Sequence, residues 1–393
     1  MKTASHEPRV CLQCGARLPS DAVTCPDCNA PTTRLIDFQN SDARLLREGP
    51  RLVEERKRLG LEGLVGGLEF VVINTEPEDQ RVAVAELLSR TGLDVIDGFL
   101  DAEKRTVALR VSDSADVLVT SRTASSPFAT FTDHPKSRDR RAARLETLAF
   151  ACTDLDAYEQ IQRGRGIEFM SEEPIVSDDF RFLQTVPSRY TGNSIGLIEW
   201  RGTNRSYRGP GSVPLDWAFE KPPIDYLAHV GRLDHAATRV RAADRDAAIL
   251  EFIGLTNYHF EFAIYVRSLN SITNVARLSP NEFAMVFTSG IAPLAGSKAP
   301  GPTEGFIRNY GPRVHHLAWD TDSIDDVYAG LKSEGQAFLL DLVGSPEEGL
   351  KQTFSEASPT TLLVNEYIHR FGDFDGFFSR SNVTLLTEAT KKQ

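Results

Sequence analysis

Hydrophobic and polar positions repeat four times along the chain in one order: a strand, an amphipathic helix, then three strands. Alternating apolar residues indicate the strands, and apolar positions about 3.6 residues apart indicate the helices. The four first strands are expected at 68–75, 145–153, 232–240 and 313–321, and their helices near 77–90, 155–162, 244–253 and 323–332. In the second and fourth units the strand after the helix is expected at 167–170 and 337–342. Four βαβββ units predict an α+β fold.

The four units also form two similar pairs, which indicates a duplicated two-unit domain. Three positions of the first pair align with three of the second, at separations of 165, 169 and 167 residues. At these positions the N-terminal copy has Phe70, Thr147 and Glu199, and the C-terminal copy has His235, His316 and Glu366. The C-terminal copy is therefore expected to hold a metal site that the N-terminal copy has lost.

Two imidazoles and one carboxylate from three strands of one cup are typical of non-haem Fe(II) sites, because they leave three of six coordination positions open. A single histidine on an apolar strand is more often a packed side chain than a ligand. The coincidence of three candidates at equivalent points of the repeat is what favours the metal. The remaining histidines lack this register and are expected to be structural or exposed: His6, His134, His229, His259 and His369.

His315 precedes the second candidate ligand directly. Adjacent strand residues point to opposite faces, so only one of His315 and His316 is expected to enter the cup. The register of the repeat selects His316, and His315 is expected behind it or on the outer face.

Length, composition and charge narrow the class of protein. A chain of 393 residues predicts two or three domains, and 41% hydrophobic with 25% charged residues is ordinary for a globular protein. With 44 basic and 55 acidic residues the net charge is −11, which argues against nucleic acid or a membrane surface as partner. No apolar run reaches about 18 residues and no secretory signal is evident, so a cytoplasmic location is expected.

Four of the five cysteines, Cys11, Cys14, Cys25 and Cys28, form two CxxC pairs near the N-terminus. Such pairs favour a closed tetrahedral Zn(II) site, and a dithiol redox pair is the alternative. Residues 1–33 are therefore expected to form a zinc ribbon that stabilises the protein or binds a partner protein. The charged segment 34–66 is expected to be a helical linker, interrupted at Pro50, which could dock on the main body. Cys152 is expected in the core.

From about Leu68 to Leu386 the chain resembles the vicinal oxygen chelate superfamily, and within it 4-hydroxyphenylpyruvate dioxygenase-like proteins. The resemblance is carried by RLDHAATRV, VHHLAWDTDSID and NEYIHRFGDFDGFF, which contain the three candidate ligands. It implies an N-terminal domain at 67–205 with a degenerate metal site and a catalytic domain at 225–390. It also implies four side chains that position the substrate, namely Ser271, Gln352, Phe354 and Asn382.

The sequence departs from that family at several pocket positions. The family's Gln before the second His is His315 here, and another pocket Gln is Glu304. Asn-Glu-Pro of the family reads Thr288-Ser289-Gly290, an aromatic residue is replaced by Val383, and the stretch between His316 and Gln352 is shorter. We therefore expect a substrate other than 4-hydroxyphenylpyruvate.

The function that the resemblance implies is an Fe(II)-dependent dioxygenase that takes O₂ and a small 2-oxo acid, or another substrate with vicinal oxygens. One alternative is a non-oxidative isomerase, epimerase or lyase of the same superfamily, with another divalent metal. A second is a metabolite-sensing binding protein that works through the zinc ribbon. The resemblance further implies a homo-oligomer.

Overall fold

The structure, a computed structural model, describes residues 38–393 except 125, 295–300, 373 and 375, together with two short strands near the N-terminus. These strands, β1 (Arg9–Val10) and β2 (Arg17–Leu18), pair antiparallel. The expected zinc ligands Cys11, Cys14, Cys25 and Cys28 lie outside the described residues.

The first two βαβββ units build one mixed sheet with the strand order β11-β4-β5-β6-β3-β7-β10-β9-β8. The first unit comprises β3 (Val65–Asn74), α2 (Gln80–Arg90), β4 (Asp94–Leu100), β5 (Lys104–Arg110) and β6 (Asp116–Arg122). A 3₁₀ turn η2 (Ala129–Phe131) precedes the second, which comprises β7 (Arg144–Cys152), α3 (Leu155–Gly164), β8 (Ile175–Val176), β9 (Phe180–Gln184) and β10 (Ser194–Trp200), followed by β11 (Val213–Pro214). Antiparallel pairing of β3 with β7 joins the two units.

The last two units build a second mixed sheet with the order β13-β14-β15-β12-β16-β19-β18-β17. The third unit comprises η3 (Asp225–His229), β12 (Val230–Arg239), η4 (Ala242–Asp244), α4 (Arg245–Leu255), β13 (His259–Val266), η5 (Arg267–Leu269), β14 (Ser271–Arg277) and β15 (Ala284–Ser289). After α5 (Pro302–Tyr310), the fourth comprises β16 (Arg313–Thr321), α6 (Ile324–Ser333), β17 (Val343–Ser345), β18 (Leu350–Phe354) and β19 (Val364–Arg370), followed by α7 (Arg380–Ala389) and η6 (Thr390–Lys392).

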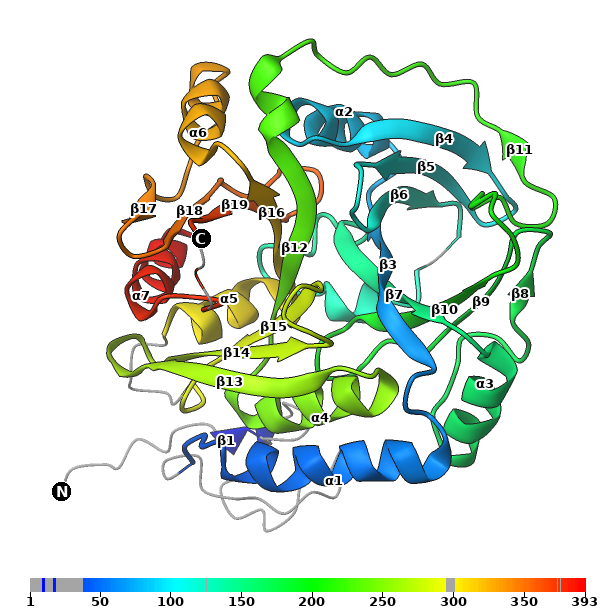
Figure 1. The fold of residues 1–393 in the computed structure, drawn as a ribbon, viewed down its shortest axis with the longest axis horizontal. Coiled ribbons are helices and arrows are strands. Elements are labelled where there is room, and N and C mark those ends of the chain that lie inside the picture. Colours follow the sequence, from blue (N-terminus) through cyan, green and yellow to red (C-terminus); the bar gives the residue numbers. More distant parts are fainter. Residues whose placement is uncertain are drawn as a thin grey trace.

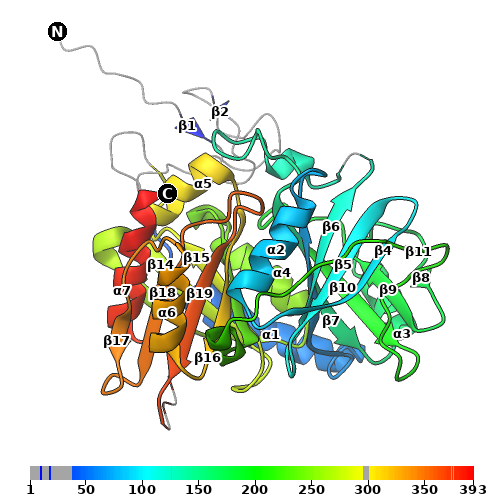
Figure 2. The same ribbon diagram turned by 90° about the horizontal axis from the view of Figure 1, so that it is seen from above.

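Both sheets curl into half-open cups that lie side by side, the N-terminal half on the right and the C-terminal half on the left (Figures 1 and 2). One large apolar core runs between the halves. Within it Phe150 of β7, Phe252 of α4 and Tyr258 meet edge to face with ring centroids 5.2–5.8 Å apart. The α+β fold expected from the hydrophobic pattern is confirmed.

Helix α1 (Ala43–Leu59) docks on the C-terminal half along α4. The expected interruption at Pro50 is wrong: the helix runs through this residue, because proline removes only one backbone hydrogen bond and the packed face compensates. The buried Arg56 guanidinium donates hydrogen bonds of 2.7–3.0 Å to backbone carbonyl oxygens, those of Ile253, Thr256 and Tyr258. The segment is thus part of the main body.

Two expected strands are largely absent from the described sheets. Segments 167–170 and 337–342 contribute only isolated bridges, Phe169 with Thr185 and Phe338 with Ser355. The short strands β8 and β17 follow later, at the sheet edges. Edge segments lack a second neighbour, so apolar residues there anchor a loop instead of extending the ladder. Among the described helices, none is both long and apolar enough to cross a membrane.

Candidate metal centre

Three adjacent central strands of the second sheet deliver the candidate ligands His235, His316 and Glu366. In the register of β12, β16 and β19, His235 lies beside Ala318 and Ala318 lies beside Glu366. His316 is two residues from Ala318 and so occupies the same face of the sheet. Period-two geometry therefore brings together three side chains that are far apart in sequence.

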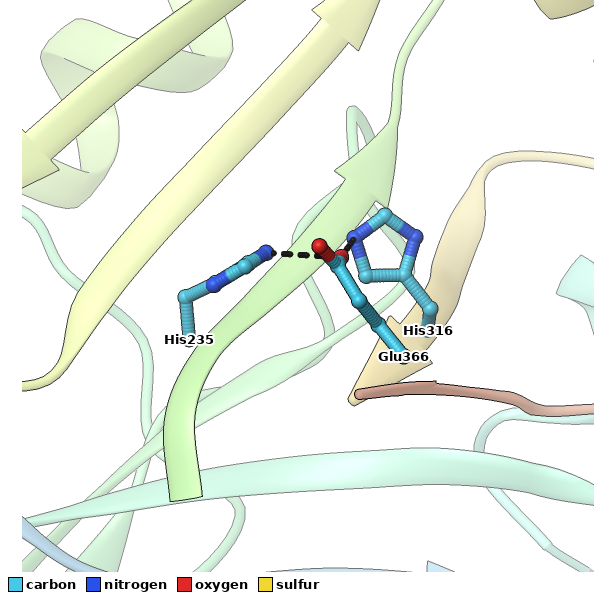
Figure 3. A group of neighbouring side chains, drawn as sticks. All are labelled: His235, His316 and Glu366. Atoms are coloured by element: carbon cyan, nitrogen blue, oxygen red, sulfur yellow. Dashed lines mark hydrogen bonds and ion pairs between the residues drawn. The ribbon is translucent and has the colours of Figure 1, made fainter. Parts of the chain in front are cut away.

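The ligand atoms of these residues all lie within 4.8 Å of one another. Nε2 of His235 is 3.1 Å and Nε2 of His316 is 3.2 Å from the same Glu366 oxygen, and Figure 3 shows the two imidazoles meeting this carboxylate. Metal bonds of about 2.1 Å place neighbouring N and O ligands about 3 Å apart. The residues His235, His316 and Glu366 are 0%, 7% and 1% exposed. The residues present therefore fit one divalent metal ion.

A buried ion pair of Asp234 and Arg370 fixes the orientation of the His235 ring. Its Nδ1 donates to a carboxylate oxygen of Asp234 at 2.7 Å, and Arg370 holds that carboxylate at 2.6 and 3.1 Å. Burial opposes ionisation of Asp234, but the charge of Arg370 and the His235 hydrogen bond outweigh it and keep the pKa of Asp234 far below its usual range. With the proton fixed on Nδ1, the Nε2 lone pair faces the centre.

Electrostatics keeps the third ligand anionic. Burial raises the pKa of Glu366, but the charge of His235 and the hydrogen bonds from both imidazoles bring it down to about 2. Burial lowers the pKa of His235, whereas Glu366 and Asp234 raise it to about 9. A metal ion that binds here must displace the proton of His235.

Both His315 and His316 point to the cup side, which corrects the expectation that only one does. Ala237 of β12 pairs with His316, and the next residue, Thr238, pairs with Val314, so His315 is the extra residue of a β-bulge. A bulge interrupts strict alternation and re-aims a side chain. The Nδ1 atoms of His315 and His316 approach to 2.8 Å.

The hydrogen bonds of this histidine pair determine its tautomers. When Nε2 of His316 faces a metal, its proton is on Nδ1 and is donated to Nδ1 of His315. The remaining nitrogen of His315, Nε2, then carries a proton that it donates to Oε1 of Gln393 at 2.7 Å. Burial and then the charge of Arg239 hold the pKa of His315 well below its ordinary value, so its ring is neutral.

Two of the predicted substrate residues, Gln352 and Asn382, form a hydrogen-bonded chain that ends on the candidate ligand Glu366. Nε2 of Gln352 donates to Glu366 Oε1 at 2.5 Å, and Nδ2 of Asn382 on α7 donates to Gln352 Oε1 at 3.1 Å. All three side chains are buried. The chain of hydrogen bonds connects helix α7 to the metal centre.

The other predicted pocket residues lie around the ligands. The Phe354 ring is 4.7 Å from the His316 ring and lines a cavity at the centre. The hydroxyls of Ser271 and Thr303 are 3.3 Å apart, and Thr303 lines the same cavity. Glu304 instead accepts a hydrogen bond from the backbone N–H of Ala242, so it has a structural contact.

Sequence reasoning missed Arg239, which lines the same small cavity of about 40 Å³ as His316 and Glu366. The sequence could have identified Arg239, because it lies four residues after His235 on the same strand, and residues four apart on a strand share a face. His235 and Arg239 are such a pair on β12.

The N-terminal cup carries none of the three candidate ligands at the equivalent positions. Strand pairing confirms Phe70 and Thr147 as the counterparts of His235 and His316. It assigns Gly196, not Glu199, to the position of Glu366, since Ala149 pairs with Gly196 as Ala318 pairs with Glu366. The expected alignment of Glu199 was therefore wrong. Aromatic side chains line the cavity of this cup, including Phe70, Phe182 and Tyr207.

Comparisons with known proteins identify the fold. No family model and no curated protein matches the sequence. A triple mutant of 4-hydroxymandelate synthase from Streptomyces coelicolor superimposes with a TM-score of 0.62 at 18% identity, covering 84% of this chain and 98% of that one. A xylose isomerase-like TIM barrel/4-hydroxyphenylpyruvate dioxygenase fusion protein gives 0.59 at 15% identity, covering 88% of this chain and 57% of the fusion. The chain thus has the paired-domain fold of vicinal oxygen chelate proteins.

Proposed function

We propose that this chain is a metal-dependent dioxygenase of the 4-hydroxyphenylpyruvate dioxygenase-like type. In this proposal His235, His316 and Glu366 bind Fe(II), and the organic substrate is a small 2-oxo acid. The observation that carries the proposal is the convergence of these three buried side chains, each held in a ligating orientation by a neighbour. The fold shared with 4-hydroxymandelate synthase supports it.

The proposed reaction consumes one 2-oxo acid and one O₂. The C1 carboxylate leaves as CO₂, one oxygen atom enters the new carboxylate, and the other becomes a hydroxyl group on the remaining carbon skeleton. Fe(II), when bound, would act as the Lewis acid that the 2-oxo acid chelates, and it would supply the redox chemistry with O₂.

The protein residues would hold the metal ligands in place, orient the substrate and exclude water. Asp234 and His315 hold the imidazoles in the tautomers that present Nε2, and Gln352 orients the Glu366 carboxylate. We propose that Phe354 stacks on the substrate. Ser271 would help to place its polar groups through Thr303, and Asn382 through Gln352. Phe354 and Phe378 line the cavity, and their rings would help to exclude water from a bound substrate.

Anaerobic titration of Fe(II)-loaded protein with 2-oxo acids tests the proposal, followed by O₂ uptake and CO₂ release when air is admitted. We expect chelation and stoichiometric gas exchange, and neither with His316→Ala or Glu366→Ala. Absence of both in the intact protein would overturn the dioxygenase assignment. Turnover that is independent of O₂ and supported by another metal would instead favour a non-oxidative enzyme.

A further inference from the structure

The guanidinium of Arg239 is a buried cation that faces the metal centre. It lies on β12 on the face of His235, is 5% exposed, and lines the cavity together with His316 and Glu366. Burial lowers the pKa of Arg239 to about 9, so the group stays charged at neutral pH.

Its contacts leave the charge uncompensated. Nη1 is 3.4 Å from the carbonyl oxygen of Pro302, and Nη2 is 3.4 Å from Nε2 of His315. That nitrogen donates to Gln393 in the tautomer described above, so it has no lone pair to accept from Arg239. No carboxylate in the described part of the chain forms an ion pair with Arg239; its other neighbour is the Phe306 ring, 4.5 Å away.

Another buried arginine shows how a matched charge looks in this fold. The Arg245 side chain, fully buried, bonds to the carboxylate of Asp42 and the carboxamide of Asn274. An unpaired buried charge is costly, and buried charges are normally paired or bound to a ligand. Arg144 and Arg313 are also buried without an ion pair among the described residues, but neither lines the cavity at the metal centre. Arg239 does line it, so a ligand bound there can supply the counter-charge of this arginine.

The sum of the charges at the centre predicts the charge of the ligand that would neutralise it. A divalent metal, one carboxylate and Arg239 sum to +2, because Asp234 and Arg370 neutralise each other and the histidines are neutral. A 2-oxo acid with a single carboxylate leaves +1 in a buried site. A 2-oxo acid with two carboxylates, which is a dianion, leaves a net charge of zero.

We propose that the substrate carries a second carboxylate, remote from its 2-oxo acid end, and that Arg239 binds this group. The inference rests on the proposed function only for the 2-oxo acid group of the substrate, which would chelate the metal. A carboxylate matches the planar fork of a guanidinium in a bidentate pair. Thr273, Thr288 and Thr303 line the same cavity as Arg239, so its wall is partly polar.

Binding of two matched acids to the Zn(II)-loaded full chain tests the proposal without turnover. 2-Oxoglutarate and 2-oxopentanoate have the same length and differ only in the distal carboxylate. By calorimetry we expect 2-oxoglutarate to bind about 10- to 100-fold more tightly, the range of a charge-assisted hydrogen bond. Equal affinity of the two acids in the intact protein would overturn the inference by itself.

Variants assign the preference to the residue. Arg239→Met should bind both acids with similar affinity, and Arg239→Lys should keep part of the preference, while circular dichroism confirms that both variants are folded. An undiminished preference in Arg239→Met would also overturn the inference. A preference that depends on Arg239, without any O₂ uptake by the Fe(II) form, would leave the inference standing and remove the dioxygenase proposal.

Discussion

Nδ1 of His315 lies 2.8 Å from Nδ1 of His316, although the two residues are adjacent on one strand. The contact exists because a β-bulge in β16 turns both rings to the cup. One of the two nitrogens must carry the proton, and metal binding through Nε2 of His316 assigns it to His316. His315 thereby becomes the acceptor that fixes the tautomer of a candidate ligand.

Replacement of His315 by leucine should weaken metal binding. The variant removes the acceptor of the His316 N–H, and loss of such a partner costs about 10- to 100-fold in metal affinity. His315→Gln is the matched control, because its amide oxygen can accept the same hydrogen bond. Competition with a chromophoric chelator measures both affinities. An unchanged affinity in the leucine variant would show that the contact does not serve the metal.

Replacement of Asp234 by alanine should have a similar effect through His235. The variant removes the carboxylate that accepts from His235 Nδ1 and leaves Arg370 without its partner. We expect about 10- to 100-fold weaker metal binding in the same competition assay. Glu69, which precedes Phe70 as Asp234 precedes His235, offers a matched control. It bonds to Trp200 and Arg205 in the half without metal ligands, so Glu69→Ala should not change the metal affinity.

Much of this centre could be predicted from the sequence, and the failures have physical causes. His235 and His316 follow from the repeat, since the order of elements fixes which strands are neighbours. The bulge at His315 does not, because one extra residue leaves the hydrophobic pattern almost unchanged. Glu199 was misaligned because Glu199-Trp200 looks like Glu366-Tyr367. A slip of three residues is odd, so it moves a side chain to the opposite face of the sheet.

Asp244, at the start of α4, should make the protein less stable as the pH rises. Burial raises the pKa of this carboxyl to about 6, although Arg241 opposes the shift. The unfolded chain releases the proton near pH 3.9. Between about pH 4 and 6 the unfolded state therefore gains a charge that the folded state resists, and stability falls across this window.

The variant Asp244→Asn isolates this effect, because asparagine has nearly the same shape and does not titrate. We expect its advantage in free energy of unfolding over the original protein to grow from pH 4 to 6 and then level off, at no more than about 3 kcal/mol. Urea unfolding at pH 4 and 7 measures the difference. An advantage that is the same at both pH values would contradict the assigned pKa.

Packing should oppose a metal ligand in the N-terminal cup at the position equivalent to Glu366. A Cβ atom added to Gly196, the counterpart of Glu366, would lie 2.8 Å from the Phe182 ring, whose strand position corresponds to that of Gln352. Overpacking of this kind typically costs about 1–3 kcal/mol, so Gly196→Ala should destabilise the protein by that amount. In a Phe182→Leu background the same substitution should cost less, since the ring no longer occupies the space. Chemical unfolding of the four proteins of this double-mutant cycle gives the coupling between the two positions. Strictly additive effects would mean that the Phe182 ring does not obstruct a side chain at position 196, and would contradict the packing explanation.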